Sequence, residues 1–482
     1  MRKFLKPLSA AVTAVGLLWA VPHAAAFCGF YVAKADANLF NKASKVVIAR
    51  DGDSTVVTMA NDYQGDPKEF AMVIPTPVVL ARNQIRVSSN ERVDTIDGYS
   101  APRLVEYFDP DPCPPPGPEY EVSPLVFSPP PPEPAAFVAA PAPAVDFGVT
   151  IEAQYEVEEY DILILSAEES DGLQRWLTKE GYKVPPKAND VLASYIAQDM
   201  KFFVAKVNLD RLGAAQDPDW NGFLRPLQIA YEHGKFMLPI RLGTVNANGP
   251  QDLLVYFLTR NGRVEATNYR TLDIPSEDEI PPFVEERFDD FYRALFDKQV
   301  AETQMKAVFT EYSWPLQIKC DPCVAGAPTQ QELIELGATW LAEDYKVSPE
   351  GVVSFREPDG WRVGPAHLTR LHMRYTAETF PQDLMFQETG DKETFQGRYV
   401  MRQPFRGNTS CPAGQDYLNA LNARHKTEAA NLANLTGWNS DEIKNDMREA
   451  GFIAPRVVNG ELSFDSLGDW VAWLSRDDSK DQ

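Results

Sequence analysis

The sequence predicts an α+β fold, in which antiparallel, sandwich-like β-sheet cores are packed against several helices. Three features of the 482 residues predict it: β-rich runs recur between residues 45 and 269, turn signals join two pairs of these runs, and apolar side chains recur at helical spacing at 283–305 and 415–435. Because 44% of the residues are hydrophobic, the chain can bury the cores of two or three domains.

The first β-rich runs predict a hairpin. Residues 45–50 and 54–59 flank Asp51-Gly52-Asp53, where glycine tolerates the positive φ of a tight turn. We expect the next run, 70–75, to add a third strand to the same sheet, because two strands alone are only marginally stable.

The middle of the chain carries both strand and helix patterns. Helices are predicted at 172–180 and 189–198, and strands at 149–155, 161–165, 201–207, 227–231, 235–240, 253–259 and 263–269. The last two strands flank Asn261-Gly262, a strong hairpin signal, and we expect a second hairpin there.

The clearest helix of the middle region spans 283–305. It places five apolar side chains on one face: Phe288, Phe291, Tyr292, Leu295 and Phe296. An aromatic stripe of this kind is more often core than a ligand site. A second long helix is predicted at 415–435, and Asn439-Ser440 supplies the N-cap of a third.

A proline-rich segment interrupts the folded regions. Fourteen of the 39 prolines lie within 109–145, and proline removes the backbone donor, so we expect a linker or surface insert outside any sheet or helix. The alternative is a docking ligand of polyproline type. The predicted organisation is a signal peptide at 1–26, a β-rich region at 27–108, this segment, an α+β domain at 146–310 and a C-terminal α+β region at 311–482 that ends in helices.

The N-terminus has the pattern of a cleavable secretory signal peptide. Basic residues precede an apolar stretch from Ala10 to Val21, and Ala24-Ala25-Ala26 supplies a small-residue cleavage site. We therefore expect a periplasmic or secreted protein without a transmembrane anchor after cleavage. Loss of Arg2, Lys3 and Lys6 would change the formal net charge from -23 to -26, a sign that disfavours nucleic acid and anionic lipid as partners.

Five cysteines would remain in the mature chain and are the disulfide candidates: Cys28, Cys113, Cys320, Cys323 and Cys411. An odd number leaves one thiol over. Cys320-Asp321-Pro322-Cys323 could close a small disulfide ring, act as a redox pair or form one edge of a zinc site. We favour the disulfide, because Asp321 raises thiol pKa values by like-charge repulsion and the next helix is expected only near Thr329.

Other chemistry has no signature in the sequence. A zinc site lacks a second Cys-x-x-Cys pair, and His367 and His372, five residues apart on a predicted strand, would point to opposite faces. The motifs of serine hydrolases, metalloproteases and nucleotide-binding loops do not occur. We therefore predict no catalytic, metal or cofactor residues, and the ligand or protein partner stays open.

Several segments together resemble DUF2330, a family of uncharacterised bacterial secreted proteins. They include Phe27-Cys28-Gly29-Phe30, residues 61–65 with 70–75, Leu238 to Gly243, Lys319 to Cys323 with 333–337, and Leu368 to Tyr375. The resemblance implies an extracytoplasmic protein without an assigned activity, so it transfers no catalytic residue. The leading hypothesis is a non-catalytic binding or structural module, and the alternative is a thiol-disulfide oxidoreductase that uses Cys320 and Cys323.

Overall fold

The fold is taken from a computed structural model. It describes residues 24–25, 30–34, 40–64, 70–114, 144–185, 187–208, 211, 224–245, 247, 249–318, 326–342 and 365–452. Helices and strands together confirm the α+β class, and the sheets are largely antiparallel.

The largest sheet has the order β17-β18-β19-β15-β3-β4-β13-β6. Its strands are β3 (Phe40–Asp51), β4 (Ser54–Gln64), β6 (Ile85–Val87), β13 (Leu227–Glu232), β15 (Gln251–Thr259), β17 (Arg270–Asp273), β18 (Ala307–Pro315) and β19 (His367–Tyr375). Two short strands, β1 (Ala24–Ala25) and β21 (Phe395–Gln396), pair with β15 and β18. The pairs β3–β15 and β17–β18 are parallel, and the other pairs along this order are antiparallel.

A second sheet, with the order β11-β2-β5-β12-β10-β9-β8, is antiparallel throughout. Its strands are β2 (Phe30–Lys34), β5 (Phe70–Thr76), β8 (Ala144–Asp146), β9 (Val149–Val157), β10 (Tyr160–Ala167), β11 (Tyr182–Lys183) and β12 (Lys201–Val207). Buried residues of both sheets, among them Ile48, Ile74 and Phe203, form one hydrophobic cluster. The two sheets therefore face each other across a shared core, as expected for a sandwich-like arrangement.

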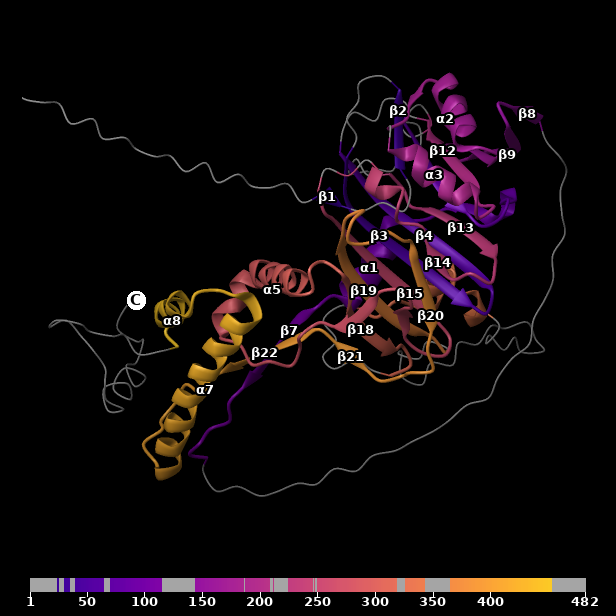
Figure 1. The fold of residues 1–482 in the computed structure, drawn as a ribbon. Coiled ribbons are helices and arrows are strands. Elements are labelled where there is room, and N and C mark those ends of the chain that lie inside the picture. Colours follow the sequence, from indigo (N-terminus) through magenta and orange to yellow (C-terminus); the bar gives the residue numbers. More distant parts are fainter. Residues whose placement is uncertain are drawn as a thin grey trace, which may run out of the picture.

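Helices cover the outer faces of both sheets (Figure 1). Helices α2 (Ser170–Lys179) and α3 (Ala188–Ile196) pack on the second sheet through residues such as Val73, Trp176 and Tyr195. Helices α1 (Asn90–Ser100) and α6 (Gln330–Glu335), with the 3-10 helix η4 (Thr339–Ala342), cover the outer face of the large sheet. A small sheet of β14 (Met237–Leu238), β20 (Leu384–Glu388) and β16 (Val264–Ala266) adds apolar side chains to the core shared by the two large sheets.

The C-terminal helices form an arm that projects from the sheets (Figure 1). It consists of α5 (Phe288–Glu302), α7 (Pro412–Thr436) and α8 (Ser440–Glu449), with a parallel pair of strands, β7 (Arg103–Phe108) and β22 (Arg398–Gln403). One hydrophobic cluster joins these elements to β18. Among the described helices, none is long and apolar enough to cross a membrane.

The first predicted hairpin is confirmed. The prediction that residues 70–75 add a third strand to its sheet is wrong. Strands β3 and β4 pair around Gly52, which has a φ of 57°. Strand β5 pairs instead with β2 and β12 of the second sheet. The reason is that β5 is buried on both faces: Ile74 faces the inter-sheet core and Val73 faces α2 and α3.

The predicted hairpin at Asn261-Gly262 is wrong. Strand β15 pairs with β3 and β19, whereas β16 leaves that sheet and pairs with β20. Gly262 is needed for a different reason, because a Cβ atom there would lie 2.3 Å from the carbonyl oxygen of Asp391. The glycine thus permits close backbone approach rather than a tight turn.

The remaining helix predictions hold with small changes. Residues 283–305 begin as a 3-10 helix, η3 (Pro282–Arg287), and continue as α5, whose Phe291, Leu295 and Phe296 are buried as expected. Asn439 caps α8.

Residues 109–114 and 144–145 of the proline-rich segment belong to the described fold, and 144–145 are in β8; residues 115–143 lie outside the described part. The regions predicted at 27–108, 146–310 and 311–482 all contribute strands to the large sheet.

Candidate functional site

The most concentrated group of ionisable side chains surrounds Glu311. The pairing of β18 with β19 is irregular between Thr310 and Tyr312, so Glu311 is the extra residue of a bulge. Its side chain is fully buried between the large sheet and α5. A buried carboxylate needs donors for its oxygens, and the neighbouring elements supply them.

Three side chains bind the Glu311 carboxylate. Arg370 Nε donates to Oε2 at 2.5 Å, and His372 Nδ1 lies 2.6 Å from Oε1. The hydroxyl of Tyr292, on α5, also donates to Oε1. Burial opposes ionisation, but His372 and Arg370 outweigh it and hold the pKa of Glu311 at about 2.

A second carboxylate, Asp97 on α1, continues this cluster. It accepts hydrogen bonds from Arg370 Nη1 and the Tyr256 hydroxyl, both at 2.7 Å, and Lys45 Nζ lies 2.6 Å away. Burial opposes ionisation here too, but Arg370 and Lys45 lower the pKa of Asp97 to about 2. We call Lys45, Asp97, Arg370, Glu311, His372, Tyr256 and Tyr292 the Glu311 cluster.

The Glu311 cluster contains the residue types of general acid-base catalysis, but its groups bind one another. Arg370 is bonded to both carboxylates, and the ring of Phe296 stacks on His372 with centroids 3.7 Å apart. A catalytic acid or base must reach a substrate proton at hydrogen-bond distance. The geometry instead ties α1 and α5 to the large sheet.

A second pair of interest is Ser313 and His367. Ser313 Oγ and His367 Nε2 are 2.8 Å apart, which is the geometry of a nucleophile and its base. Both residues are buried, and among the described residues Nδ1 of His367 has no hydrogen-bond partner to orient it. Burial lowers the pKa of His367 to about 4. We interpret the pair as a structural hydrogen bond.

Ser313→Ala tests this interpretation. We expect the free energy of unfolding to fall by about 1–2 kcal/mol, because the substitution leaves a buried imidazole nitrogen unsatisfied. Chemical denaturation followed by tryptophan fluorescence measures the change. A fluorophosphonate probe should leave Ser313 unlabelled in the wild-type protein, and mass-spectrometric detection of an adduct at Ser313 would show an accessible nucleophile instead.

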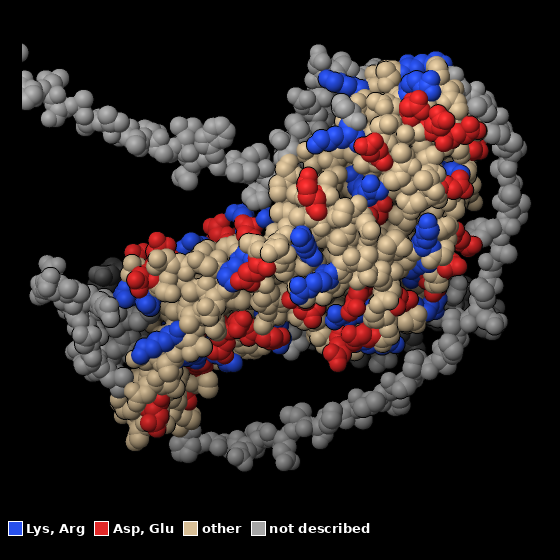
Figure 2. All heavy atoms as spheres, viewed as in Figure 1, with Lys and Arg blue, Asp and Glu red and all other residues tan. Residues whose placement is uncertain are grey.

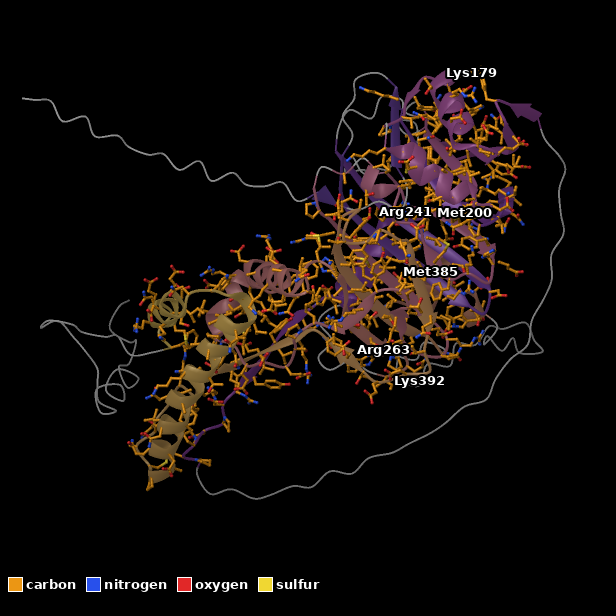
Figure 3. The ribbon with its side chains drawn as sticks, viewed as in Figure 1. Lys179, Met200, Arg241, Arg263, Met385 and Lys392 are labelled. Atoms are coloured by element: carbon orange, nitrogen blue, oxygen red, sulfur yellow. A yellow bond between two sulfur atoms is a disulfide. The ribbon has the colours of Figure 1, made fainter. Side chains whose placement is uncertain are left out.

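A third buried carboxylate, Asp383, joins α3 to the small sheet. Its Oδ1 accepts from the Tyr195 hydroxyl at 2.7 Å and from the backbone N–H groups of Ile240 and Arg241 at 2.9 and 3.2 Å. Burial raises the pKa of Asp383 despite these donors. Figure 3 labels Arg241, Met200 and Met385 at this junction.

A small apolar hollow lies between the two sheets. Val57, Met59, Ile74, Ile229 and Met237 line it, and its volume is about 20 Å³. That volume holds about one water molecule and is too small for an organic ligand. On the face shown in Figure 2, lysine and arginine are interspersed with acidic side chains rather than gathered into one basic surface.

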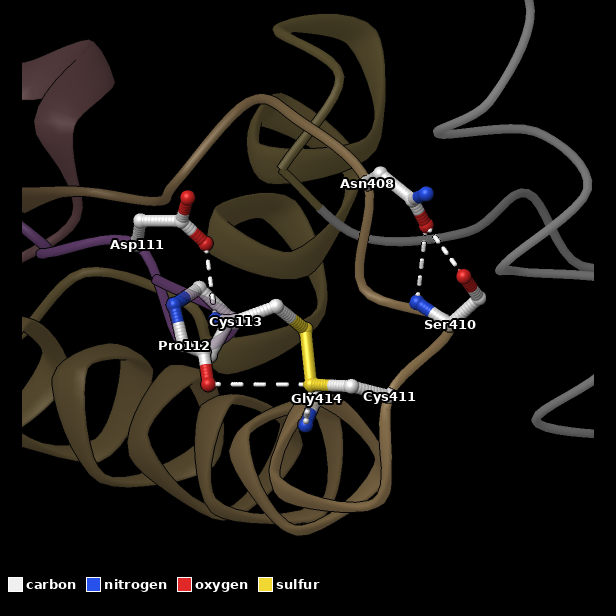
Figure 4. Close-up of a disulfide and its surroundings, with 7 residues drawn as sticks. All are labelled: Asp111, Pro112, Cys113, Asn408, Ser410, Cys411 and Gly414. Atoms are coloured by element: carbon white, nitrogen blue, oxygen red, sulfur yellow. Dashed lines mark hydrogen bonds between the residues drawn. A yellow bond between two sulfur atoms is a disulfide. The ribbon is translucent and has the colours of Figure 1, made fainter. Parts of the chain in front are cut away.

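The structure pairs two of the five predicted disulfide candidates. Cys113 and Cys411 form a disulfide across 298 residues of sequence (Figure 4). Cys411 is also the N-cap residue of α7, and its sulfur lies 3.2 Å from the backbone nitrogen of Gly414. Cys28, Cys320 and Cys323 lie outside the described residues. The predictions for these three cysteines therefore stay predictions.

The two strand histidines have separate partners. His367 contacts Ser313, whereas His372 contacts Glu311 and stacks on Phe296. No group of three or more metal-binding side chains occurs in the described ranges. The sequence interpretation missed Glu311 and Arg370, although charged residues at alternate positions of the otherwise apolar strand at 368–375 are a usable signal of a buried polar cluster.

The fold and these clusters define an α+β protein with a sandwich of two sheets and a polar, mutually paired interior. A family model matches residues 22–387, more than half of the 482 residues. The chain therefore belongs to DUF2330, described as an uncharacterized protein conserved in bacteria. No curated protein and no solved structure matches the chain. The matched region ends within β20, so Cys113 lies inside it and Cys411 with α7 and α8 lies beyond it.

Proposed function

We propose that this protein works outside the cytoplasm as a non-catalytic binding or structural module. The observation that carries the proposal is that the groups of the Glu311 cluster bind one another. Each carboxylate oxygen of Glu311 is bound by a neighbouring side chain. Such a network fixes the helices on the sheet instead of presenting reactive groups to a substrate. The signal-peptide pattern and the Cys113–Cys411 disulfide support an oxidising compartment outside the cytoplasm.

The second candidate is a thiol-disulfide oxidoreductase in which Cys320 attacks and Cys323 resolves. A redox pair needs its first cysteine at a helix N-terminus, where the helix dipole stabilises the thiolate. The next described helix after the motif is α6, whose N-cap is Thr329, bonded to Glu332. The five residues between Cys323 and this cap favour the structural disulfide.

Thiol exchange separates the two candidates. The mature protein, isolated from the periplasm or medium, is incubated with a dithiol and a disulfide substrate beside a Cys320→Ser variant. We expect the two proteins to give equal rates, because Cys320 has no catalytic role in a structural disulfide. A rate that falls at least tenfold in Cys320→Ser but not in Cys28→Ser would establish the oxidoreductase.

The same material tests export. We expect its N-terminal sequence to begin at Phe27. We expect the non-reduced digest to contain the Cys113–Cys411 peptide. Intact Met1 on protein confined to the cytoplasm, with reduced thiols, would contradict an extracytoplasmic role.

A further inference from the structure

The arm carries a second group of charged residues, most of them partly buried, where α7 meets the β7–β22 pair. We call this group the α7 seam: Asp109 after β7, Glu279 before η3, Arg402 on β22, and Arg424 and Glu428 on α7. Apolar residues of α7 and β22, including Leu432 and Tyr399, pack in the same cluster. The α7 seam therefore joins α7 to the β7–β22 pair inside the arm.

The charges of the α7 seam do not balance. Asp109 forms a two-point ion pair with Arg424 at 2.8 and 2.9 Å, and Glu279 pairs with Arg402 at 2.5 Å. These pairs occupy the two guanidinium groups. Glu428 is the third carboxylate, and its ion pair is with Nε of Arg424, whose guanidinium group already binds Asp109.

Glu428 is fully buried and makes no hydrogen bond within the described chain. Its side chain is 0% exposed, and neither carboxylate oxygen has a hydrogen-bond partner in the described chain. Arg424 Nε lies 3.1 Å from Oε1, but this N–H makes no hydrogen bond to it. A buried carboxylate without hydrogen bonds costs more in its ionised form than in its protonated form.

The surroundings of Glu428 favour the protonated form of its carboxyl group. Burial raises the pKa of Glu428 to about 7; Arg424 opposes the shift, and Glu279 and Asp109 reinforce it. Two other titratable neighbours keep their neutral form between pH 5 and pH 8. Burial and Arg424 lower the pKa of His425 to about 4, and burial and Asp109 raise that of Tyr417 to about 12.

We propose that the α7 seam is a proton-controlled clamp, which is closed while Glu428 holds its proton and loosens when Glu428 ionises. The Cys113–Cys411 disulfide keeps the N-terminal end of α7 attached in both states. Loosening thus frees the helix face that carries Leu432 without releasing the arm. In an exported chain, the clamp would respond to the pH of the surroundings.

The direction follows from linkage. Glu428 has a higher pKa in the closed seam than in an open one, where it is near its ordinary 4.5. The stabilisation of the closed form is therefore complete below pH 4.5 and is lost as the pH rises through about 7. The opening equilibrium should increase on the order of 50-fold between pH 5 and pH 8.

Hydrogen exchange of the full mature protein tests the clamp. Exchange is measured at pH 5, 6, 7 and 8, with labelling times scaled for the intrinsic exchange rate. We expect peptides from α7 to lose protection on the order of 50-fold over this range while peptides from α2 do not. Glu428→Gln, which copies the protonated acid, should abolish the pH dependence, and the exposed-site control Glu442→Gln should retain it.

Two results would overturn the clamp. One is the same pH dependence of α7 protection in Glu428→Gln and in the wild-type protein. The other is a carboxyl carbon-13 NMR titration of wild-type Glu428 with a midpoint below pH 5, which decides the matter even if Glu428→Gln does not fold.

Discussion

Replacing Arg370 with methionine is expected to lower the free energy of unfolding by about 3–5 kcal/mol. Arg370 is 6% exposed and bonds both carboxylates of the Glu311 cluster. Methionine keeps much of the apolar volume but leaves Glu311 and Asp97 without their shared cation. The loss reflects a buried, uncompensated charge rather than the strength of one ion pair.

Denaturant unfolding at pH 7, followed by circular dichroism, measures this loss. Arg293→Met is the matched control, because Arg293 is an exposed arginine that pairs with Asp290 on the surface of α5; a change of no more than about 0.5 kcal/mol is expected there. The double variant Glu311→Gln, Arg370→Met should recover part of the stability. Equal losses in Arg370→Met and Arg293→Met would show that the Glu311 cluster is not a major source of stability.

The same cluster predicts the acid sensitivity of the fold. The pKa of Glu311 is about 2 in the folded protein and 4.5 in an ordinary environment. Its stabilising contribution is therefore present above pH 4.5 and is lost as the pH falls through about 2. In Arg370→Met the folded-state pKa of Glu311 should rise. The part of the unfolding free energy that is lost in acid because Glu311 takes up a proton should therefore be smaller than in the wild-type protein.

Local elements of this protein were predictable because their signals are local. The Asp51-Gly52-Asp53 turn, the aromatic stripe of α5 and the Asn439 cap each depend on residues close in sequence. The same reasoning failed at Asn261-Gly262, because the pairing of β15 is decided by β3 and β19, which lie far away along the chain.

The polar clusters could not be derived from the sequence for a related reason. Glu311, Arg370 and Asp97 come together only when a bulge in β18 faces β19 and α1 packs over both. With 69 acidic residues in the chain, no composition argument selects two of them. The alternating charges at Arg370, His372 and Arg374 on an otherwise apolar strand were the available sign. A strand buried on both faces accepts such residues only if partners cross from neighbouring elements.

Removing the Cys113–Cys411 disulfide should destabilise the arm. The cross-link closes a loop across 298 residues, and loop-closure entropy of that size sets an upper value of about 6 kcal/mol for its effect. The measured loss in a Cys113→Ser, Cys411→Ser variant should be smaller, about 2–4 kcal/mol, since the Asp109–Arg424 pair still joins the end of β7 to the middle of α7. Serine at 411 is itself a good N-cap, so the start of α7 is preserved and the variant isolates the cross-link.

Denaturation without reductant compares this double variant with the wild-type protein. We expect α7 peptides to lose hydrogen-exchange protection before those of the large sheet, because the disulfide joins α7 to the segment after β7 within the arm. Reduction of the wild-type protein is a weaker test, since it also reaches any bond among Cys28, Cys320 and Cys323. Equal stability of both proteins, together with the cross-linked peptide in the wild-type digest, would show that the ion pair and the apolar cluster hold α7 unaided.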